Sequence, residues 1–158
     1  MKKRKIFAAC LALLILLQLF AGCAKEDVHF WDNAKGWLTQ AFKKDNIVVL
    51  GSEPHSRTII IDTQEEYERA FEADTSAPTA DFSKQMIVLY TFVDINRRKN
   101  ILTDVDVENG VLKFVCEDVP PKGSNYGDTC SPYQRWFVVT LDKVDVNSVI
   151  FEWKESGV

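Results

Sequence analysis

Three residue types on which much protein chemistry depends are scarce in this chain of 158 residues. It has two histidines, four cysteines and seven glycines. The glycines form neither a phosphate-binding loop nor a dinucleotide-binding fingerprint. His29 and His55 lie far along the chain from the cysteines, whereas a structural zinc site needs four ligands at short spacing. We therefore expect no metal site and no bound cofactor.

Positive charge is also scarce once the first 22 residues are set aside. Those residues hold four of the 19 basic side chains and none of the 23 acidic ones, so the remainder has a formal charge of −8. Phosphate binding needs clustered lysine and arginine, so this balance argues against a nucleic-acid partner. It also provides no polybasic patch for anionic lipid headgroups.

The N-terminus has the pattern of a secretory signal. Met1–Lys5 is basic, and the apolar run Ile6–Ala21 that follows is interrupted only by Gln18. A charged start followed by a short apolar run is typical of a signal peptide. The run is shorter than the roughly 20 apolar residues that span a bilayer. We therefore predict that residues 1–22 form a signal peptide.

The end of this segment, Leu19-Phe20-Ala21-Gly22-Cys23, resembles the lipobox of bacterial lipoproteins. The resemblance implies that the Cys23 thiol is acylated and that the chain is cleaved before it. Residues 23–27 would then be a lipidated tether. Two or three acyl chains anchor stably where one does not, so we expect attachment to the extracytoplasmic face of the cell membrane. The alternative is an ordinary secretory signal with a coincidental cysteine.

The remaining cysteines suggest one disulfide. Cys10 lies in the signal and Cys23 is the expected lipid acceptor, which leaves Cys116 and Cys130. Exported domains favour disulfides, and this bond would close the loop 117–132 at its base, for a gain of about 3 kcal/mol. The alternative is a free thiol that acts with histidine as a nucleophile.

Hydrophobic patterning predicts an α+β fold: a mostly antiparallel sheet with one or two helices, in a single small domain over residues 28–158. The expected helices are 28–44 and 64–73, and the expected strands are 47–50, 57–62, 86–93, 103–108, 111–116, 133–141 and 148–154. Asp62 or Thr63 can cap the helix 64–73, and Glu66 is the capping-box acid if Thr63 is the cap.

The turn Asn109-Gly110 between two alternating runs predicts a two-residue β-hairpin. Its register would place apolar side chains on one face and charged ones on the other. The expected pairs are Glu108 with Val111, Val107 with Leu112, Asp106 with Lys113, Val105 with Phe114 and Thr103 with Cys116.

Two groups of polar residues are weak candidates for chemistry. Carboxylates alternate along 104–108, but the glycine and the glutamate that a calcium loop requires are absent at the corresponding positions. Ser52, His55 and Ser56 lie together without the glycine pattern of a nucleophile elbow. We therefore predict no catalytic residue, and a solvated sheet face explains the carboxylates.

Candidate partner contacts lie in and beside the loop 117–132, which three prolines and two glycines interrupt. Loops on a rigid scaffold often carry binding function. The alternative is a proline-stiffened surface loop that has no binding role. A basic cluster between strands could bind a carboxylate, or could simply be a charged turn. The candidate contacts are Lys122, Tyr126, Tyr133, Arg97 and Arg98.

About half of the chain after residue 22 resembles the PrcB-type lipoproteins of bacterial protease complexes. The similar stretches are Gln64-Glu65-Glu66-Tyr67, then Pro78, then Asp81–Val88, and later Pro132-Tyr133-Gln134. The family's Thr-Gly-Gly-Tyr stretch is absent, and residues 94–99 stand in its place. The resemblance implies a non-enzymatic accessory module that binds another extracytoplasmic protein. The alternative is a small-ligand-binding protein or minor hydrolase with a pocket beside the loop 117–132.

Overall fold

The structure is a computed structural model that describes residues 27–73, 76–95, 98–120 and 131–154. These residues form one small α+β domain, as predicted, in which most strand pairs are antiparallel. The elements, in chain order, are β1 (His29–Trp31), α2 (Gln40–Asp45), β2 (Ser56–Ile61), α3 (Gln64–Ala70), β3 (Gln85–Asp94), β4 (Lys99–Glu108), β5 (Val111–Val119), β6 (Tyr133–Asp142) and β7 (Ser148–Lys154).

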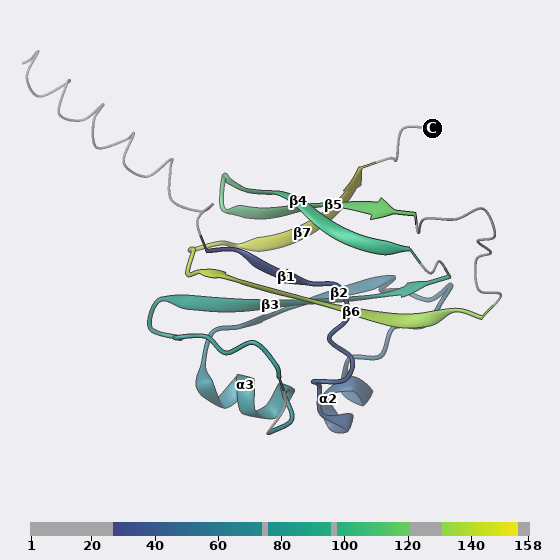
Figure 1. The fold of residues 1–158 in the computed structure, drawn as a ribbon, viewed down its shortest axis with the longest axis horizontal. Coiled ribbons are helices and arrows are strands. Elements are labelled where there is room, and N and C mark those ends of the chain that lie inside the picture. Colours follow the sequence, from purple (N-terminus) through teal and green to yellow (C-terminus); the bar gives the residue numbers. More distant parts are fainter. Residues whose placement is uncertain (1–26, 74–75, 96–97, 121–130, 155–158) are drawn as a thin grey trace, which may run out of the picture.

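The strands form two sheets that pack face to face. The main sheet has the order β1-β6-β3-β2, and the second sheet has the order β4-β5-β7. All pairs are antiparallel except β5 with β7. Figure 1 shows the second sheet on one face of the main sheet and both helices on the other. The main sheet is therefore the middle of three layers.

This middle position explains why β3 and β6 read as nearly continuous apolar runs. Alternate side chains of a strand point to opposite faces, and here both faces are covered. Leu89 and Val138 pack toward the helices, whereas Val88 and Val139 pack toward the second sheet, and all four are fully buried. The prediction that residues 86–93 form a central strand is confirmed, because β3 lies between β6 and β2.

The capping box before α3 is also confirmed, with Thr63 as the cap. The Glu66 backbone N–H donates to Thr63 Oγ1 at 3.3 Å, and Glu66 Oε2 accepts from the Asp62 backbone N–H at 3.1 Å. The helix ends at Ala70 rather than at residue 73. It ends early because Phe71 leaves the helix to form a β-bridge with Leu38.

The predicted helix over residues 28–44 is wrong. Its first part is the strand β1, and only Gln40–Asp45 is helical. Phe30 and Trp31 follow the period of a strand, since they pack on opposite faces of the main sheet: Phe30 lies 5.1 Å from Phe137, and Trp31 lies 6.1 Å from Trp37, between ring centroids. Pairing with β6 satisfies the β1 backbone and overrides the helical spacing.

The hairpin register is confirmed from Asn109-Gly110 outward through four pairs, but the pair Thr103 with Cys116 is wrong. A β-bulge at Thr103 shifts the register, and Leu102 lies opposite Cys116 instead. The bulge brings Leu102 onto the apolar core between the sheets, while Thr103 is exposed and donates its hydroxyl to the Val115 carbonyl at 3.1 Å.

The expected strand 47–50 is wrong as well, because these residues lie in the connection between α2 and β2. In the part of the chain that the structure describes, no helix is long and apolar enough to cross a membrane. The predicted signal peptide 1–22 and Cys23 lie outside the described residues.

Candidate functional site

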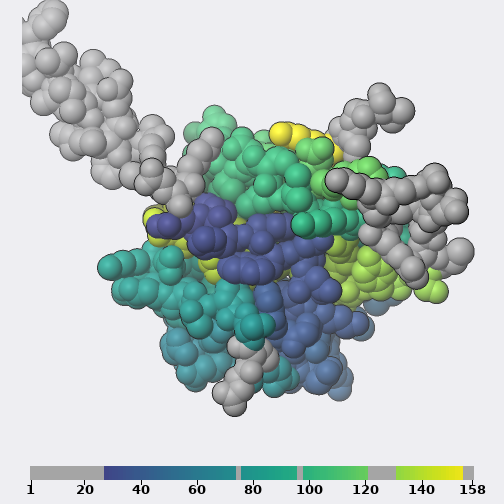
Figure 2. Space-filling view, viewed as in Figure 1, coloured from purple at the N-terminus to yellow at the C-terminus, as the bar shows by residue number. Residues whose placement is uncertain are grey.

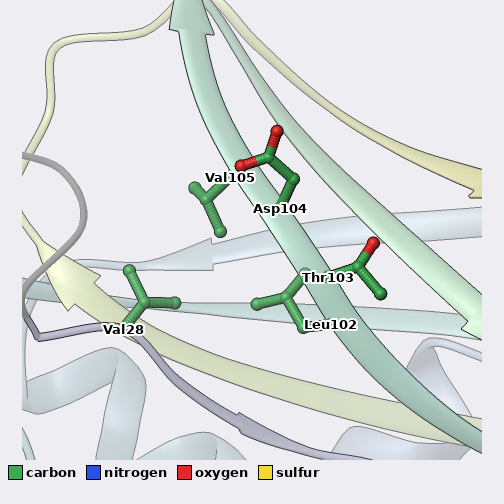
Figure 3. Close-up of a pocket in the computed structure, with 5 residues that line it drawn as sticks. All are labelled: Val28, Leu102, Thr103, Asp104 and Val105. Carbon is green, nitrogen blue, oxygen red and sulfur yellow. The ribbon is translucent and has the colours of Figure 1, made fainter.

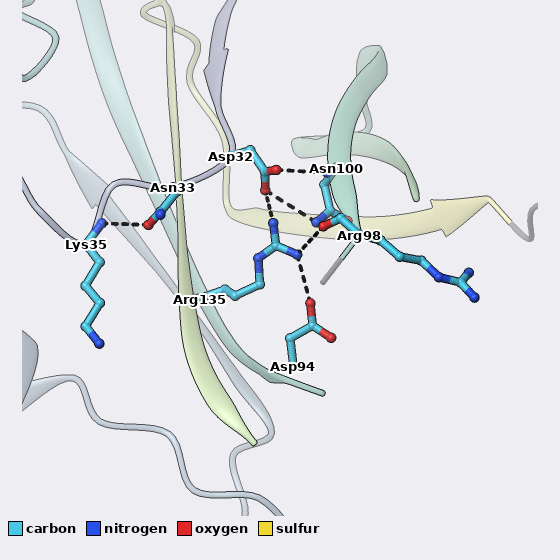
Figure 4. Close-up of polar contacts among 7 residues, drawn as sticks. All are labelled: Asp32, Asn33, Lys35, Asp94, Arg98, Asn100 and Arg135. Atoms are coloured by element: carbon cyan, nitrogen blue, oxygen red, sulfur yellow. Dashed lines mark hydrogen bonds and ion pairs between the residues drawn. The ribbon is translucent and has the colours of Figure 1, made fainter. Parts of the chain in front are cut away.

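One arginine lies almost buried at the end of the main sheet where β6 begins and β3 ends. Arg135 is 8% exposed. Its Nη1 donates to Asp94 Oδ2 at 2.8 Å and to the Arg98 carbonyl at 2.9 Å, and its Nη2 pairs with Asp32 (Figure 4). The guanidinium thus joins residues from the ends of β1 and β3 to the residue that precedes β4.

Asp32 extends this cluster to the second sheet. Its Oδ2 accepts the Asn100 backbone N–H at 3.0 Å, and its Oδ1 accepts the Asn100 side-chain amide at 3.3 Å. Asn100 lies in β4 and is 1% exposed. The Asp32 carboxylate therefore holds the edge of the second sheet against the main sheet, and the cluster forms a rigid base at this end of the domain.

Burial and charge shift two pKa values in this cluster. Burial lowers the pKa of Arg135, but the hydrogen bond to Asp94 and the charge of Asp32 outweigh it, so the net shift is upward. The pKa of Asp118 on β5 is raised, first by burial and then by the negative charge of Asp94. The positive charges of Arg98 and Arg135 oppose this rise in the pKa of Asp118 but do not cancel it.

A groove of about 360 Å³ opens over this base. It brings together two of the candidate contacts from the sequence, Arg98 and Tyr133, with two further lysines. Figure 4 shows the Arg98 side chain extending away from Arg135. Arg98 Nε is buried and has no hydrogen-bond partner among the described residues. The lining residues are Asp32, Asn33, Lys35, Arg98, Lys99, Tyr133, Gln134 and Arg135.

The groove is continued by hollows along the seam between β1 and β4, which are edge strands of the two sheets. Asp32 and Lys99 line both the groove and the first hollow, which continues past Phe30 and Leu102. Figure 3 shows the far hollow, where Val28 faces the side chains of β4. In Figure 2 the chain around β1 lies at the surface beside the green second sheet. The site thus has a basic end and an apolar flank.

Cys116 lies on β5 with its side chain fully buried. Burial, followed by the charges of Asp32 and Asp118, raises the pKa of its thiol to about 12. A thiol with so high a pKa supplies almost no thiolate at neutral pH, which argues against the reactive-cysteine alternative. Its expected partner, Cys130, lies outside the described residues, so the disulfide stays a prediction.

Ser52, His55 and Ser56 do not form a catalytic relay with one another. The Ser52 hydroxyl donates to the Val49 carbonyl at 2.8 Å, and His55 Nε2 lies 2.8 Å from an oxygen of the exposed Glu53. The hydroxyl of Ser56 is hydrogen-bonded to Tyr90. Among the described residues no group of histidine, cysteine, aspartate and glutamate is placed to hold a metal ion, and this includes the carboxylates of 104–108.

Asp32, Asp94 and Arg135 were not among the candidate residues that the sequence indicated. They are separated by up to 103 positions, and no short motif links them. One signal was available: Arg135 lies in a strand directly before its apolar run, and a charged residue buried in such a strand needs a partner. Of the other candidate contacts, Arg97, Lys122 and Tyr126 lie outside the described residues.

A scan against protein-family models, a search of curated proteins and a search of solved structures each found no match to this chain. The resemblance to the PrcB-type lipoproteins therefore rests on the residues that carry it.

Proposed function

We propose that this chain is a lipid-anchored, extracytoplasmic, non-enzymatic module that binds an acidic segment of another protein in the groove at Arg98 and Tyr133. One observation carries the proposal. Lys35, Arg98 and Lys99 gather at one groove, on a domain whose overall charge is −8 once residues 1–22 are removed. A local basic site on an acidic surface selects and steers a partner of complementary charge.

The rigid base supports this function. Arg135 is held by two carboxylates and a carbonyl, so its charge is largely neutralised inside the cluster. The rim cations carry the positive charge that a partner meets, and the Arg98 side chain extends away from Arg135 (Figure 4). Arginine can bind a carboxylate through two parallel hydrogen bonds. Tyr133 adds an aromatic contact at 37% exposure.

The test for the groove is a charge reversal on the full, anchored protein. Arg98→Glu combined with Lys99→Glu should abolish recovery of the partner when the protein is captured from its native membrane. Lys84→Glu combined with Lys143→Glu is the matched control, because it also reverses two charges and both lysines are exposed at the opposite end of the main sheet. If the groove variant and the control recover the same protein in equal amounts, the groove is not the binding site. Recovery of a small carboxylate compound in place of a protein would favour the small-ligand alternative.

The anchor has its own test. Cys23→Ala should abolish acylation and release the domain from the membrane fraction. Fractionation and intact mass measurement decide the point. A variant that stays with the membrane and carries the same lipid mass would refute the lipid anchor without bearing on the groove.

A further inference from the structure

The three most exposed large hydrophobic side chains of the described residues lie within four positions of one another. Ile47 is 58% exposed, Val49 55% and Leu50 60%. Single exposed apolar residues are ordinary, but a contiguous exposed group marks an interaction site. We call residues 47–52 the apolar turn.

The apolar turn is held in one shape by its own contacts. Val48 is 5% exposed and anchors the turn to the domain. The Ser52 backbone N–H and hydroxyl both donate to the Val49 carbonyl, at 3.1 and 2.8 Å. Gly51 has φ of +77° at the third position of this turn, where a residue with a Cβ is strained. The turn therefore presents Leu50 at its tip.

The apolar turn lies next to the groove. Asn46, the residue before it, accepts a hydrogen bond from the Gln134 side chain at 2.9 Å, and Gln134 lines the groove. Lys43, on the preceding helix α2, donates to the Lys35 carbonyl at 3.3 Å, which brings a further cation to the same end. One partner segment can therefore contact both features.

This end of the domain lies away from the expected tether. β1 begins opposite Thr140 on β6, six residues from Gln134, so at about 3.3 Å per residue the start of β1, which the expected tether precedes, lies about 20 Å from Gln134 along the sheet. This distance from the expected anchor favours a protein over the lipid surface as the partner of the apolar turn.

We infer that the apolar turn is the second half of the docking surface: Leu50, with Ile47 and Val49, enters an apolar pocket on the same partner whose carboxylates contact Arg98 and Lys99. The inference rests on the proposed function and adds the chemistry of the partner, a segment with apolar residues beside acidic ones. Electrostatic contacts at the groove orient the partner, and burial of the turn supplies affinity.

Site-specific photo-crosslinking in the full, anchored protein tests this inference. The photoreactive residue p-benzoylphenylalanine replaces Leu50, Tyr133 or Ile150 in separate variants. Ile150 is the matched control, since it is 38% exposed but lies on β7. We expect one protein to crosslink from positions 50 and 133 and to be absent from the crosslinks of position 150. Its crosslinked peptides should carry apolar and acidic residues.

The outcomes separate the two proposals. A protein crosslinked from position 133 but not from 50 overturns the role of the turn and leaves the groove standing. Lipid adducts, or a second copy of this chain, at position 50 also overturn it. No protein at either position refutes both proposals. As an independent measure, Leu50→Ser should weaken binding of the crosslinked segment, made as a synthetic peptide, by about tenfold or more, while Ile60→Ser leaves it unchanged.

Discussion

Replacing Arg135 by methionine should be among the most destabilising single changes in this domain. Methionine keeps an unbranched apolar stem beside Phe137, whose ring centroid lies 5.5 Å from the arginine Cζ, but it removes the charge. Two carboxylates then lose their cation, and the side chains of Asp94 and Asp32 are only 11% and 20% exposed. Removing one partner of a buried ion pair costs about 3–5 kcal/mol. Asp32 keeps its bonds from Asn100, so we expect a loss of about 3 kcal/mol.

Urea denaturation measures this loss without the ionic screening that guanidinium chloride would add. Arg98→Met is the control, because the Arg98 side chain points away from the cluster (Figure 4), and its loss of stability should stay below about 1 kcal/mol. Adding Asp32→Asn and Asp94→Asn to Arg135→Met should recover much of the lost stability, because no uncompensated charge then remains at these positions. If Arg135→Met alone lowers the free energy of unfolding by less than about 1 kcal/mol, the cluster does not hold the two sheets together as described.

Three further predictions concern other parts of the domain. Thr63→Ala should lower the free energy of unfolding by about 1 kcal/mol in denaturant titration, because it removes the cap of α3, and an unchanged midpoint would contradict the cap. The pKa of Asp118 is higher in the folded state than in the unfolded state. Stability is therefore lost as the pH rises from the unfolded-state pKa through the folded-state pKa of this carboxyl group. Asp118→Asn should therefore raise stability at pH 7, and the gain should shrink on acidification; a gain independent of pH would refute this cause. Thiol titration after unfolding without reductant should find neither Cys116 nor Cys130 free, and reduction should cost about 2–4 kcal/mol of stability; a free thiol at both positions would refute the disulfide.

Local signals in the sequence were sufficient for the elements whose stability is decided over a few residues. Asn109-Gly110 adopts the positive φ angles of its turn, 53° and 77°, and so sets the start of the hairpin. At the start of α3, Thr63 Oγ1 accepts the Glu66 backbone N–H and the Glu66 carboxylate accepts the Asp62 backbone N–H, all within five residues. A nearly continuous apolar run identified β3, since a strand covered on both faces needs no polar alternation.

Tertiary contacts decided the rest, because the competing energies come from partners far along the chain. Residues 28–44 carry a helical spacing of apolar side chains, yet pairing of β1 with β6, across about 110 residues, buries Phe30 and Trp31 on opposite faces and excludes the helix. The bulge at Thr103 also depends on tertiary packing, because it allows Leu102 to reach the core between the two sheets. The alternating pattern of the hairpin does not specify this contact.

The candidate site divides in the same way. Arg98 was identified from the sequence as part of a basic cluster between strands, and Tyr133 as an aromatic residue beside the loop 117–132. Both line the groove. The cluster beneath them forms only in the tertiary structure. The charge of Arg135 can be buried there because Asp32 and Asp94, from other parts of the chain, neutralise it. Sequence determined which side chains were available for binding, and only the packing of two sheets decided which of them share a surface, because burial of a charge depends on partners that no local pattern records.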